Sequence, residues 1–241
     1  LHDDVVDEST LRRGQDTANA LWGNSASVLV GDYLYSRSFE LMVSVQKLRV
    51  MDILSRSTTA IAEGEVLQLL NCNNPATTEQ KYLEVISRKT AILFSAAAQL
   101  AAILDEATPA IETALKDYGM HLGIAFQLID DALDYRANPE ELGKNLGDDL
   151  ADGKPTLPLI YAIEHGTPAQ STVLRNAIET GDRDAFRKVY EIVESTDAIT
   201  YTSARAVEEA NKAVDALRII PASVYKDALV SLARFSVERS Y

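Results

Sequence analysis

The sequence predicts an all-α protein, and three observations support this fold class. Residues 18–47 and 48–71 carry apolar side chains at helical spacing over many turns. Nearly all of the seven prolines fall in loops or at proposed helix starts, where proline is tolerated. No run of alternating apolar and polar residues, typical of a half-buried strand, stands out. Because no Gly-, Ser- or Pro-rich linker divides the 241 residues, we expect a single domain over 1–241.

The chain begins with a short helical segment and a turn. Residues 1–9 are predicted to end a helix, and residues 9–14 to form a turn that closes at Gly14. One long helix is then predicted over 18–47. Gly31-Asp32 lowers its helix propensity, which suggests a place where another helix packs closely.

The next predicted helix, 48–71, has polar side chains within its apolar stripe. Glu63-Gly64-Glu65 and Gln68 interrupt the pattern, and the sequence leaves open whether they form a solvated strip or a functional one. A loop follows over 71–78. Thr78, at its end, is a predicted cap of the helix 79–104.

The rest of the chain is also predicted to be helical. Thr108-Pro109 opens a helix that runs to about Tyr135, and Asn138-Pro139 lies beyond its end. After a loop rich in Gly and charge, shorter amphipathic helices are predicted over 156–165, 169–179, 183–194, 199–216 and 221–239. We assign these helices to packing.

Two aspartates at the end of the helix before Tyr135 indicate a metal site. Asp130 and Asp134 are four residues apart, which on a helix places both carboxylates on one face, roughly 6 Å apart. Like charges at this spacing repel and destabilise a helix, and a bound cation would offset that repulsion. Carboxylate oxygens are hard ligands that suit Mg²⁺.

The same pattern occurs at the start of the chain. Leu1-His2-Asp3-Asp4-Val5-Val6-Asp7 repeats the apolar-x-Asp-Asp-x-x-Asp order of residues 128–134. A lone copy is more often a solvated acidic face, but both copies lie beside apolar residues, which favours a cavity wall. Two facing carboxylate pairs are predicted to hold a cluster of Mg²⁺ ions, with a polyphosphate supplying further oxygens.

Composition narrows the classes of partner. The net charge of −13 disfavours binding to nucleic-acid phosphates. Bound Mg²⁺ would reverse the local field, so an anionic substrate is still compatible with this charge. Cys72 is the only cysteine, which predicts no disulfide and a reducing, cytoplasmic location. No apolar run of 18 or more residues occurs, so no transmembrane helix is predicted.

Basic residues lie near both aspartate motifs. Arg12 and Arg13 follow the first motif, where a clamp on diphosphate oxygens is favoured over solvated loop arginines because guanidinium binds phosphate bidentately. Lys89, taken alone, is better explained as a solvated lysine. Lys144 and Lys154 lie in the loop after the second motif. Pro155 follows Lys154, so this is not a Walker A loop, and we expect a lid over phosphates.

Taken together, these motifs resemble those of the trans-isoprenyl diphosphate synthases (polyprenyl synthetases), over essentially the whole chain. The resemblance rests on five features in order: Asp-Asp-x-x-Asp at 3–7 and again at 130–134, Arg12-Arg13, Lys89-Thr90, Phe126-Gln127, and Gly143-Lys144 with Gly153-Lys154-Pro155-Thr156. Leu-His-Asp-Asp-Val-Val-Asp-Glu-Ser and Gly-Lys-Pro-Thr-Leu-Pro are most similar to long-chain members, among them the bacterial octaprenyl diphosphate synthases.

The resemblance implies an isoprenoid synthase-type bundle of antiparallel helices around a central cavity, usually in a homodimer. It implies a Mg²⁺-dependent, head-to-tail condensation of an allylic diphosphate with isopentenyl diphosphate. Asp3, Asp7 and Asp130 would hold Mg²⁺, and the other motif aspartates, Asp4, Asp131 and Asp134, would support them. The residues implied to contact the allylic substrate are Arg12, Lys89, Thr90, Gln127, Lys144 and Lys154. Lys89 and Lys144 would also assist catalysis, and Arg13 would contact isopentenyl diphosphate.

The family's upstream Gly-Gly-Lys-Arg-type segment, which helps bind isopentenyl diphosphate, does not occur here. The chain begins with Leu1, and its first motif starts at Asp3. We therefore expect a native N-terminal part that precedes Leu1 and carries residues for isopentenyl diphosphate and for chain length.

The closest resemblance implies an octaprenyl product made from farnesyl diphosphate for a ubiquinone side chain, with the apolar product delivered to a membrane. A shorter-chain farnesyl or geranylgeranyl synthase stays open, as does a non-catalytic subunit of a heteromeric synthase. A class I terpene cyclase is disfavoured because its second metal motif is usually an Asn/Ser/Glu pattern. A bare acidic scaffold leaves the matched Arg, Lys and Gln positions unexplained.

Overall fold

The computed structural model describes residues 1–12, 15–135 and 147–238 of the chain. It divides into two compact units, Leu1–Asp52 and Ile53–Tyr241, and each is described by itself. Within the described residues, the only strands are β1 (Leu11–Arg12) and β2 (Gln15–Asp16), which pair antiparallel with Leu11 opposite Asp16. All other elements are helical, which confirms the predicted all-α class.

The first unit contains three helices and the strand pair. Helix α1 (His2–Val6) carries the first aspartate motif, and α2 (Ala18–Trp22) and α3 (Asn24–Ser44) follow the strands. The predicted single helix 18–47 is wrong at Gly23, where a φ of 81° ends α2 and starts α3. That backbone conformation is accessible to glycine at little cost. Strand β1 occupies part of the predicted turn 9–14, of which Gly14 lies outside the described residues.

Gly31 brings helix α1 close to α3. A Cβ atom at this position would lie 2.6 Å from the Cε1 atom of His2, so only glycine leaves room for the imidazole. The His2 ring also lies 3.2 Å from the carbonyl of Val28 and 3.1 Å from Asp32 Oδ1. The predicted close packing at Gly31 is confirmed, and it anchors the helix that carries Asp3 and Asp7.

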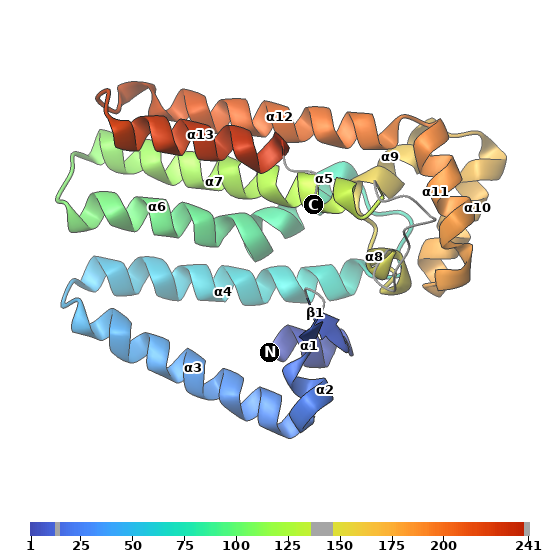
Figure 1. Ribbon diagram of the computed structural model, residues 1–241, viewed down its shortest axis with the longest axis horizontal. Helices are drawn as coiled ribbons and strands as arrows, with labels where there is room; N and C mark the ends of the chain where they lie inside the picture. The colour runs from blue at the N-terminus through green and yellow to red at the C-terminus, as the bar shows by residue number, and fades with distance from the viewer. Residues whose placement is uncertain (13–14, 136–146, 239–241) are drawn as a thin grey trace. The chain divides into compact units, whose positions relative to one another are not determined.

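The second unit is a bundle of long helices with shorter ones at one end (Figure 1). Its first elements in chain order are α4 (Leu48–Asn71, whose first residues belong to the first unit), α5 (Glu79–Ile86), the π-helical turn η1 (Ser87–Ala91), α6 (Ile92–Leu104) and α7 (Pro109–Leu133). They are followed by α8 (Asp148–Ala151), α9 (Leu157–His165), α10 (Pro168–Thr180), η2 (Arg183–Ala185), α11 (Phe186–Ser195), α12 (Ala198–Ala216), η3 (Leu217–Ile219) and α13 (Val224–Glu238).

Sequence signals for helix starts are confirmed at several places. Thr108 caps α7 through its side chain, with Pro109 in the first turn, and Thr78 caps α5 by accepting from the Lys81 amide. Helix α10 begins with a capping box between Thr167 and Gln170. The predicted helix 79–104 is continuous but passes through a π turn at Ser87–Ala91.

Helix α7 runs through the middle of this bundle, beside α6 and α12 (Figure 1). Two glycines let α6 and η1 approach it closely: a Cβ atom at Gly119 would lie 2.4 Å from the carbonyl oxygen of Phe94 on α6, and one at Gly123 would lie 2.5 Å from Cα of Ala91 in η1. Buried side chains on α7, including Leu122 and Leu128, fill the core around it. This packing fixes α7, whose C-terminal turn carries the second aspartate motif.

A separate core holds the short helices together. Leu159, Leu174 and Val189 are fully buried there, and Tyr135, from just beyond α7, stacks on Phe186 with ring centroids 5.9 Å apart. None of the described helices combines the length and the hydropathy needed to cross a membrane.

Candidate functional site

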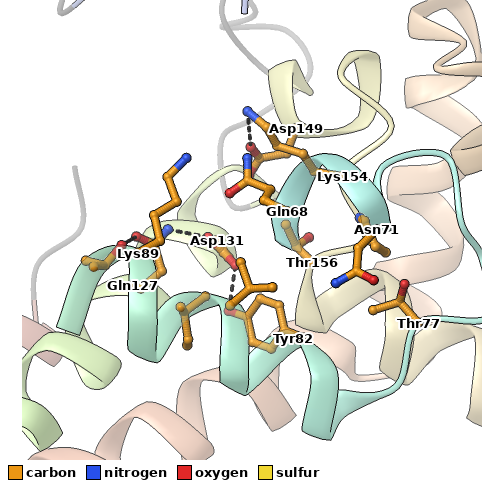
Figure 2. Close-up of a pocket in the computed structure, with 14 residues that line it drawn as sticks. Gln68, Asn71, Thr77, Tyr82, Lys89, Gln127, Asp131, Asp149, Lys154 and Thr156 are labelled. Carbon is orange, nitrogen blue, oxygen red and sulfur yellow. Dashed lines mark hydrogen bonds and ion pairs between the residues drawn. The ribbon is translucent and has the colours of Figure 1, made fainter. Parts of the chain in front are cut away.

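A cavity of about 180 Å³ lies in the second unit, at the end of α7 that carries the second aspartate motif (Figure 2). Residues from α4, the loop before α5, α5, η1, α7, α8 and the segment before α9 line it. They are Gln68, Asn71, Thr77, Tyr82, Val85, Ile86, Lys89, Thr90, Gln127, Asp131, Asp149, Lys154, Pro155 and Thr156. The cavity therefore brings together acidic, basic and amide groups that are far apart in sequence.

Asp131 lies at the centre of a hydrogen-bond network in this cavity. The Tyr82 hydroxyl donates to Asp131 Oδ2 at 2.6 Å, and Gln127 Nε2 donates to Oδ1 at 2.7 Å. The Thr90 hydroxyl donates in turn to Gln127 Oε1 at 3.1 Å. Figure 2 shows Tyr82 and Gln127 pointing at the Asp131 carboxylate, whose two oxygens each have a protein donor.

The surroundings of Asp131 are electrostatically acidic. Burial raises the pKa of Asp131 well above its ordinary value, and the nearby charges of Asp149 and Asp130 raise it further, against the hydrogen bonds from Tyr82 and Gln127. Burial and the Asp131 charge likewise raise the pKa of Tyr82, so its hydroxyl keeps its proton at neutral pH. A cation bound nearby would relieve this repulsion.

The other two aspartates of this motif lie differently. Asp130 is exposed, whereas Asp134 is partly buried and its Oδ1 accepts from the Gly147 amide at 3.3 Å. Helix α7 runs to Leu133, and Asp134 keeps helical dihedrals of −58° and −21°. The predicted helical spacing of Asp130 and Asp134 is thus confirmed.

The π turn between α5 and α6 places two predicted substrate-binding residues at the cavity. Lys89 and Thr90 both lie in this turn and line the cavity. Lys89 Nζ lies 2.9 Å from Glu65 Oε2 on α4. Gly64 permits this approach, because a Cβ atom there would lie 2.7 Å from the Lys89 amide nitrogen. Single-turn π-helices are frequent at functional sites.

The polar residues that interrupt the apolar stripe of α4 contact other side chains or the cavity. Glu65 pairs with Lys89, Glu63 pairs with Arg88 at 2.7 Å, and Gln68 lines the cavity. The interruption is therefore more than a solvated strip.

The segment before α9 is held by a neighbouring loop. The Asn73 amide donates to the Gly153 carbonyl at 2.8 Å, and Asn73 Nδ2 donates to the Ile178 carbonyl at 3.0 Å. Lys154 Nζ lies 2.7 Å from Asp152 Oδ2 and 3.9 Å from Asp149 Oδ1. Lys154 therefore reaches the cavity from an anchored segment. The expected lid of residues 143–155 is described only from 147 onward, so Lys144 lies outside the described residues.

The first aspartate motif lies in the other unit. Asp4 is buried, and Arg12 Nε donates to its Oδ1 at 2.8 Å. Burial raises the pKa of the Asp4 carboxyl, but the Arg12 guanidinium outweighs this and holds the pKa below its usual value. Asp3 is exposed and Asp7 partly buried. Arg13 lies outside the described residues.

Both motifs thus show one order of burial. The first aspartate is exposed, the second is buried and bonded to protein donors, and the third is partly buried. That the two motifs face each other stays a prediction.

Some cavity residues were not predicted from the sequence. Tyr82, Asn71 and Thr77 line the cavity without belonging to a predicted motif or to the predicted lid. For Tyr82 a signal did exist, because it precedes Lys89 by two helical turns and so shares its face. No comparable signal marks Asn71 or Thr77.

Among the described residues, no group of three or more His, Cys, Asp or Glu side chains forms a ready metal site. The motif aspartates are nevertheless hard oxygen donors, and one of them, Asp131, lines the same cavity as Lys89 and Lys154. This donor set fits an ion such as Mg²⁺, which keeps waters and binds through one or two carboxylates plus substrate phosphates.

Comparison with solved structures identifies the class of protein to which this fold belongs. The chain superimposes on solved all-α prenyl synthases, including the Caulobacter crescentus CB15 polyprenyl synthase complexed with calcium and isoprenyl diphosphate. The TM-score is 0.93 at 45% sequence identity, covering 100% of this chain and 74% of that one.

The polyprenyl synthetase family model matches residues 1–194, and the chain belongs to this family. Its sequence is 54% identical over 242 residues to the octaprenyl diphosphate synthase of Haemophilus influenzae, covering 100% of this chain and 74% of that protein. It is 53% identical over 240 residues to the octaprenyl diphosphate synthase of Escherichia coli, covering 99% and 74%. The predicted resemblance is confirmed, and the enzyme class is that of a trans-prenyltransferase that joins isopentenyl diphosphate to allylic diphosphates.

Proposed function

We propose that this protein is a Mg²⁺-dependent synthase of all-trans octaprenyl diphosphate that starts from farnesyl diphosphate. The observation that carries the proposal is the cavity in which Lys89, Thr90, Gln127 and Lys154 surround the fixed Asp131 carboxylate. The product length is supported by the 53–54% identity to octaprenyl diphosphate synthases.

Three of the six motif aspartates are assigned to metal binding. Asp3, Asp7 and Asp130 would hold Mg²⁺ on the diphosphate, and Asp4, Asp131 and Asp134 would support them. Burial supports the supporting role of Asp4 and Asp131, because both already accept bonds from protein donors and have little freedom to turn toward an ion. Bound Mg²⁺ would neutralise the diphosphate as it leaves.

The basic and amide side chains are assigned to the diphosphates. Arg12, Lys89, Thr90, Gln127, Lys144 and Lys154 would contact the allylic substrate, and Arg13 would contact isopentenyl diphosphate. Lys89 and Lys154 pair with carboxylates in this structure, so a diphosphate would replace Glu65 and Asp152 as their partners. Each exchange would replace one charge-assisted hydrogen bond with another, so the lysines would stay paired throughout.

The bond changes follow from these roles. The C1–O bond of the allylic diphosphate breaks, and diphosphate leaves with the electron pair while Lys89 and Lys154 stabilise its charge. The double bond of isopentenyl diphosphate attacks C1 of the allylic cation and forms the new C–C bond. A proton is then lost to the departing diphosphate. No side-chain nucleophile is required.

The wider setting is also proposed. By resemblance to the family, the enzyme would act as a homodimer in the cytoplasm, and would release its apolar product to a membrane for a ubiquinone side chain.

The test is a condensation assay with the full-length protein, farnesyl diphosphate, labelled isopentenyl diphosphate and Mg²⁺, with products resolved by length. We expect a ladder that ends near eight isoprene units and disappears with EDTA. A ladder that ends at three or four units would instead identify a short-chain synthase. No condensation by correctly folded protein would favour a non-catalytic subunit and would overturn the proposal.

A further inference from the structure

Each oxygen of the Asp131 carboxylate is fixed by a different helix. Tyr82 on α5 donates to Oδ2, and Gln127, one turn earlier on α7, donates to Oδ1. Asp131 is 4% exposed, so water does not compete for these positions. The carboxylate therefore has one orientation, set by its two donors.

The Tyr82 hydroxyl is the firmer of these two donors. Its bond of 2.6 Å is at the short end of the range for O–H···O hydrogen bonds. The Tyr82 ring is itself packed in the core with Ile86, Leu128 and Ile129. A rigid aromatic ring cannot adjust its reach as the flexible Gln127 side chain can, so Tyr82 sets the distance between α5 and the Asp131 turn of α7.

The network continues from Asp131 to the basic turn. Gln127 bonds to both Asp131 and Thr90, and Thr90 follows Lys89 in the π turn. A single chain of hydrogen bonds, Tyr82–Asp131–Gln127–Thr90, thus ties the acidic end of α7 to the turn that carries Lys89. Asp130, assigned to Mg²⁺, is the residue directly before Asp131.

We propose that Tyr82 is a positioning residue for the metal–diphosphate site, acting through the Asp131 carboxylate. Its hydroxyl holds the Asp130-Asp131 turn in register with Lys89 and Thr90, so that Mg²⁺ and the basic groups meet the same diphosphate. This inference rests on the proposed function. Removal of an outer partner of a metal-binding group typically lowers metal affinity or activity by about 10- to 100-fold.

The test compares two tyrosines whose hydroxyl groups donate hydrogen bonds to different partners. Tyr82→Phe removes the hydroxyl at Asp131, and Tyr118→Phe removes the hydroxyl of a similarly buried tyrosine, which donates to the Leu229 carbonyl at 2.9 Å, away from the cavity. For each variant we would measure kcat, the KM for farnesyl diphosphate, the Mg²⁺ concentration at half-maximal rate, and the Tm.

We expect Tyr82→Phe to raise the half-maximal Mg²⁺ concentration about tenfold and to lower kcat/KM by about 10- to 100-fold. Tyr118→Phe should lower the Tm and leave both kinetic values near wild type. Equal Mg²⁺ dependence in Tyr82→Phe and wild type, or the same shift in Tyr118→Phe, would overturn the proposal. An inactive wild type would instead overturn the proposed function.

A double-mutant cycle with Asp131→Asn tests whether Tyr82 acts through Asp131. In the Asp131→Asn background, Tyr82→Phe should have less than a twofold further effect on the Mg²⁺ dependence. A full, additive effect would show that Tyr82 acts elsewhere. Asp131→Asn also serves if Tyr82→Phe folds poorly, because an unchanged Mg²⁺ dependence in that variant would by itself overturn the proposal.

Discussion

At the scale of single residues, the same side chain serves different purposes within each aspartate motif. Asp4 and Asp131 are buried, and their carboxylates accept hydrogen bonds from protein donors. Asp3 and Asp130 are exposed. Spacing alone predicted that Asp130 and Asp134 matter. It did not predict that Asp131 would line the cavity with Tyr82 and Asp149, because those contacts join segments far apart in sequence.

The ion pair between Lys89 and Glu65 leads to a kinetic prediction. Both side chains are partly exposed, so their attraction is worth about 1 kcal/mol or less. Because Lys89 must leave Glu65 to bind a diphosphate, Glu65→Gln should lower the KM for farnesyl diphosphate by up to about fivefold. Steady-state kinetics at fixed Mg²⁺ would measure it.

Glu63→Gln is the matched control for that change. Glu63 lies on the same helix and pairs with Arg88, which does not line the cavity, so its KM should stay at the wild-type value. A raised KM in Glu65→Gln would contradict the account and show that Glu65 holds Lys89 in its binding position.

At the scale of elements, the helices follow from sequence signals and the exceptions follow from backbone detail. The Thr108-Pro109 start of α7 was predictable because a cap and a first-turn proline occur together. The break at Gly23 was not, because glycine also occurs inside helices such as α3 at Gly31. The π turn at Ser87–Ala91 leaves no mark in an apolar pattern read at helical period.

The close approach of α6 and α7 predicts a steric effect at Gly123. The Cβ atom of Gly123→Ala would lie 2.5 Å from Ala91 Cα and 2.8 Å from Ala91 Cβ, so the helices must separate. We expect a loss of about 1–3 kcal/mol in the free energy of unfolding, despite the better helix propensity of alanine. Thermal unfolding would show a lower Tm.

Thr113→Ala provides the control for helix propensity, because Thr113 is an exposed residue of the same helix. Its stability should be equal to or slightly above wild type. A Gly123→Ala protein as stable as Thr113→Ala would show that α6 and α7 can move apart at no cost.

At the scale of the whole molecule, a net charge of −13 makes the placement of each cation important. Glu209 on α12 illustrates this, because it is 7% exposed and binds His121 on α7 at 2.6 Å and Lys212 at 2.7 Å. Burial raises its pKa, but His121 and Lys212 outweigh burial and lower the pKa below 4.5. The ionised form therefore stabilises the link between α7 and α12.

The lowered pKa of Glu209 determines how the stability of the protein depends on pH. A carboxyl with a lowered folded-state pKa contributes stability above its unfolded pKa and loses it as pH falls through the folded value. Glu209→Gln should thus be about 1–2 kcal/mol less stable than wild type near pH 7, and the difference should shrink below about pH 4. Urea unfolding at several pH values measures this, and a difference that does not change with pH would contradict it.

The two aspartate motifs belong to different compact units, and their joint action is the central claim of the account. The sequence predicted both motifs from their repeated spacing, whereas the hydrogen bonds from Arg12, Tyr82 and Gln127 to the buried middle aspartates came from the structure. A pattern of spacing identifies residues that share a helix face, but not the donors that other segments bring to them.

The most direct test counts metal ions. Mn²⁺ would replace Mg²⁺, and electron paramagnetic resonance would report bound Mn²⁺ with and without the unreactive substrate analogue farnesyl thiolodiphosphate. We expect the analogue to tighten Mn²⁺ binding to the wild-type full chain, and Asp3→Asn and Asp130→Asn each to lose at least one bound ion. Unchanged Mn²⁺ stoichiometry in either variant would contradict the claim that both motifs hold the metal ions on one diphosphate.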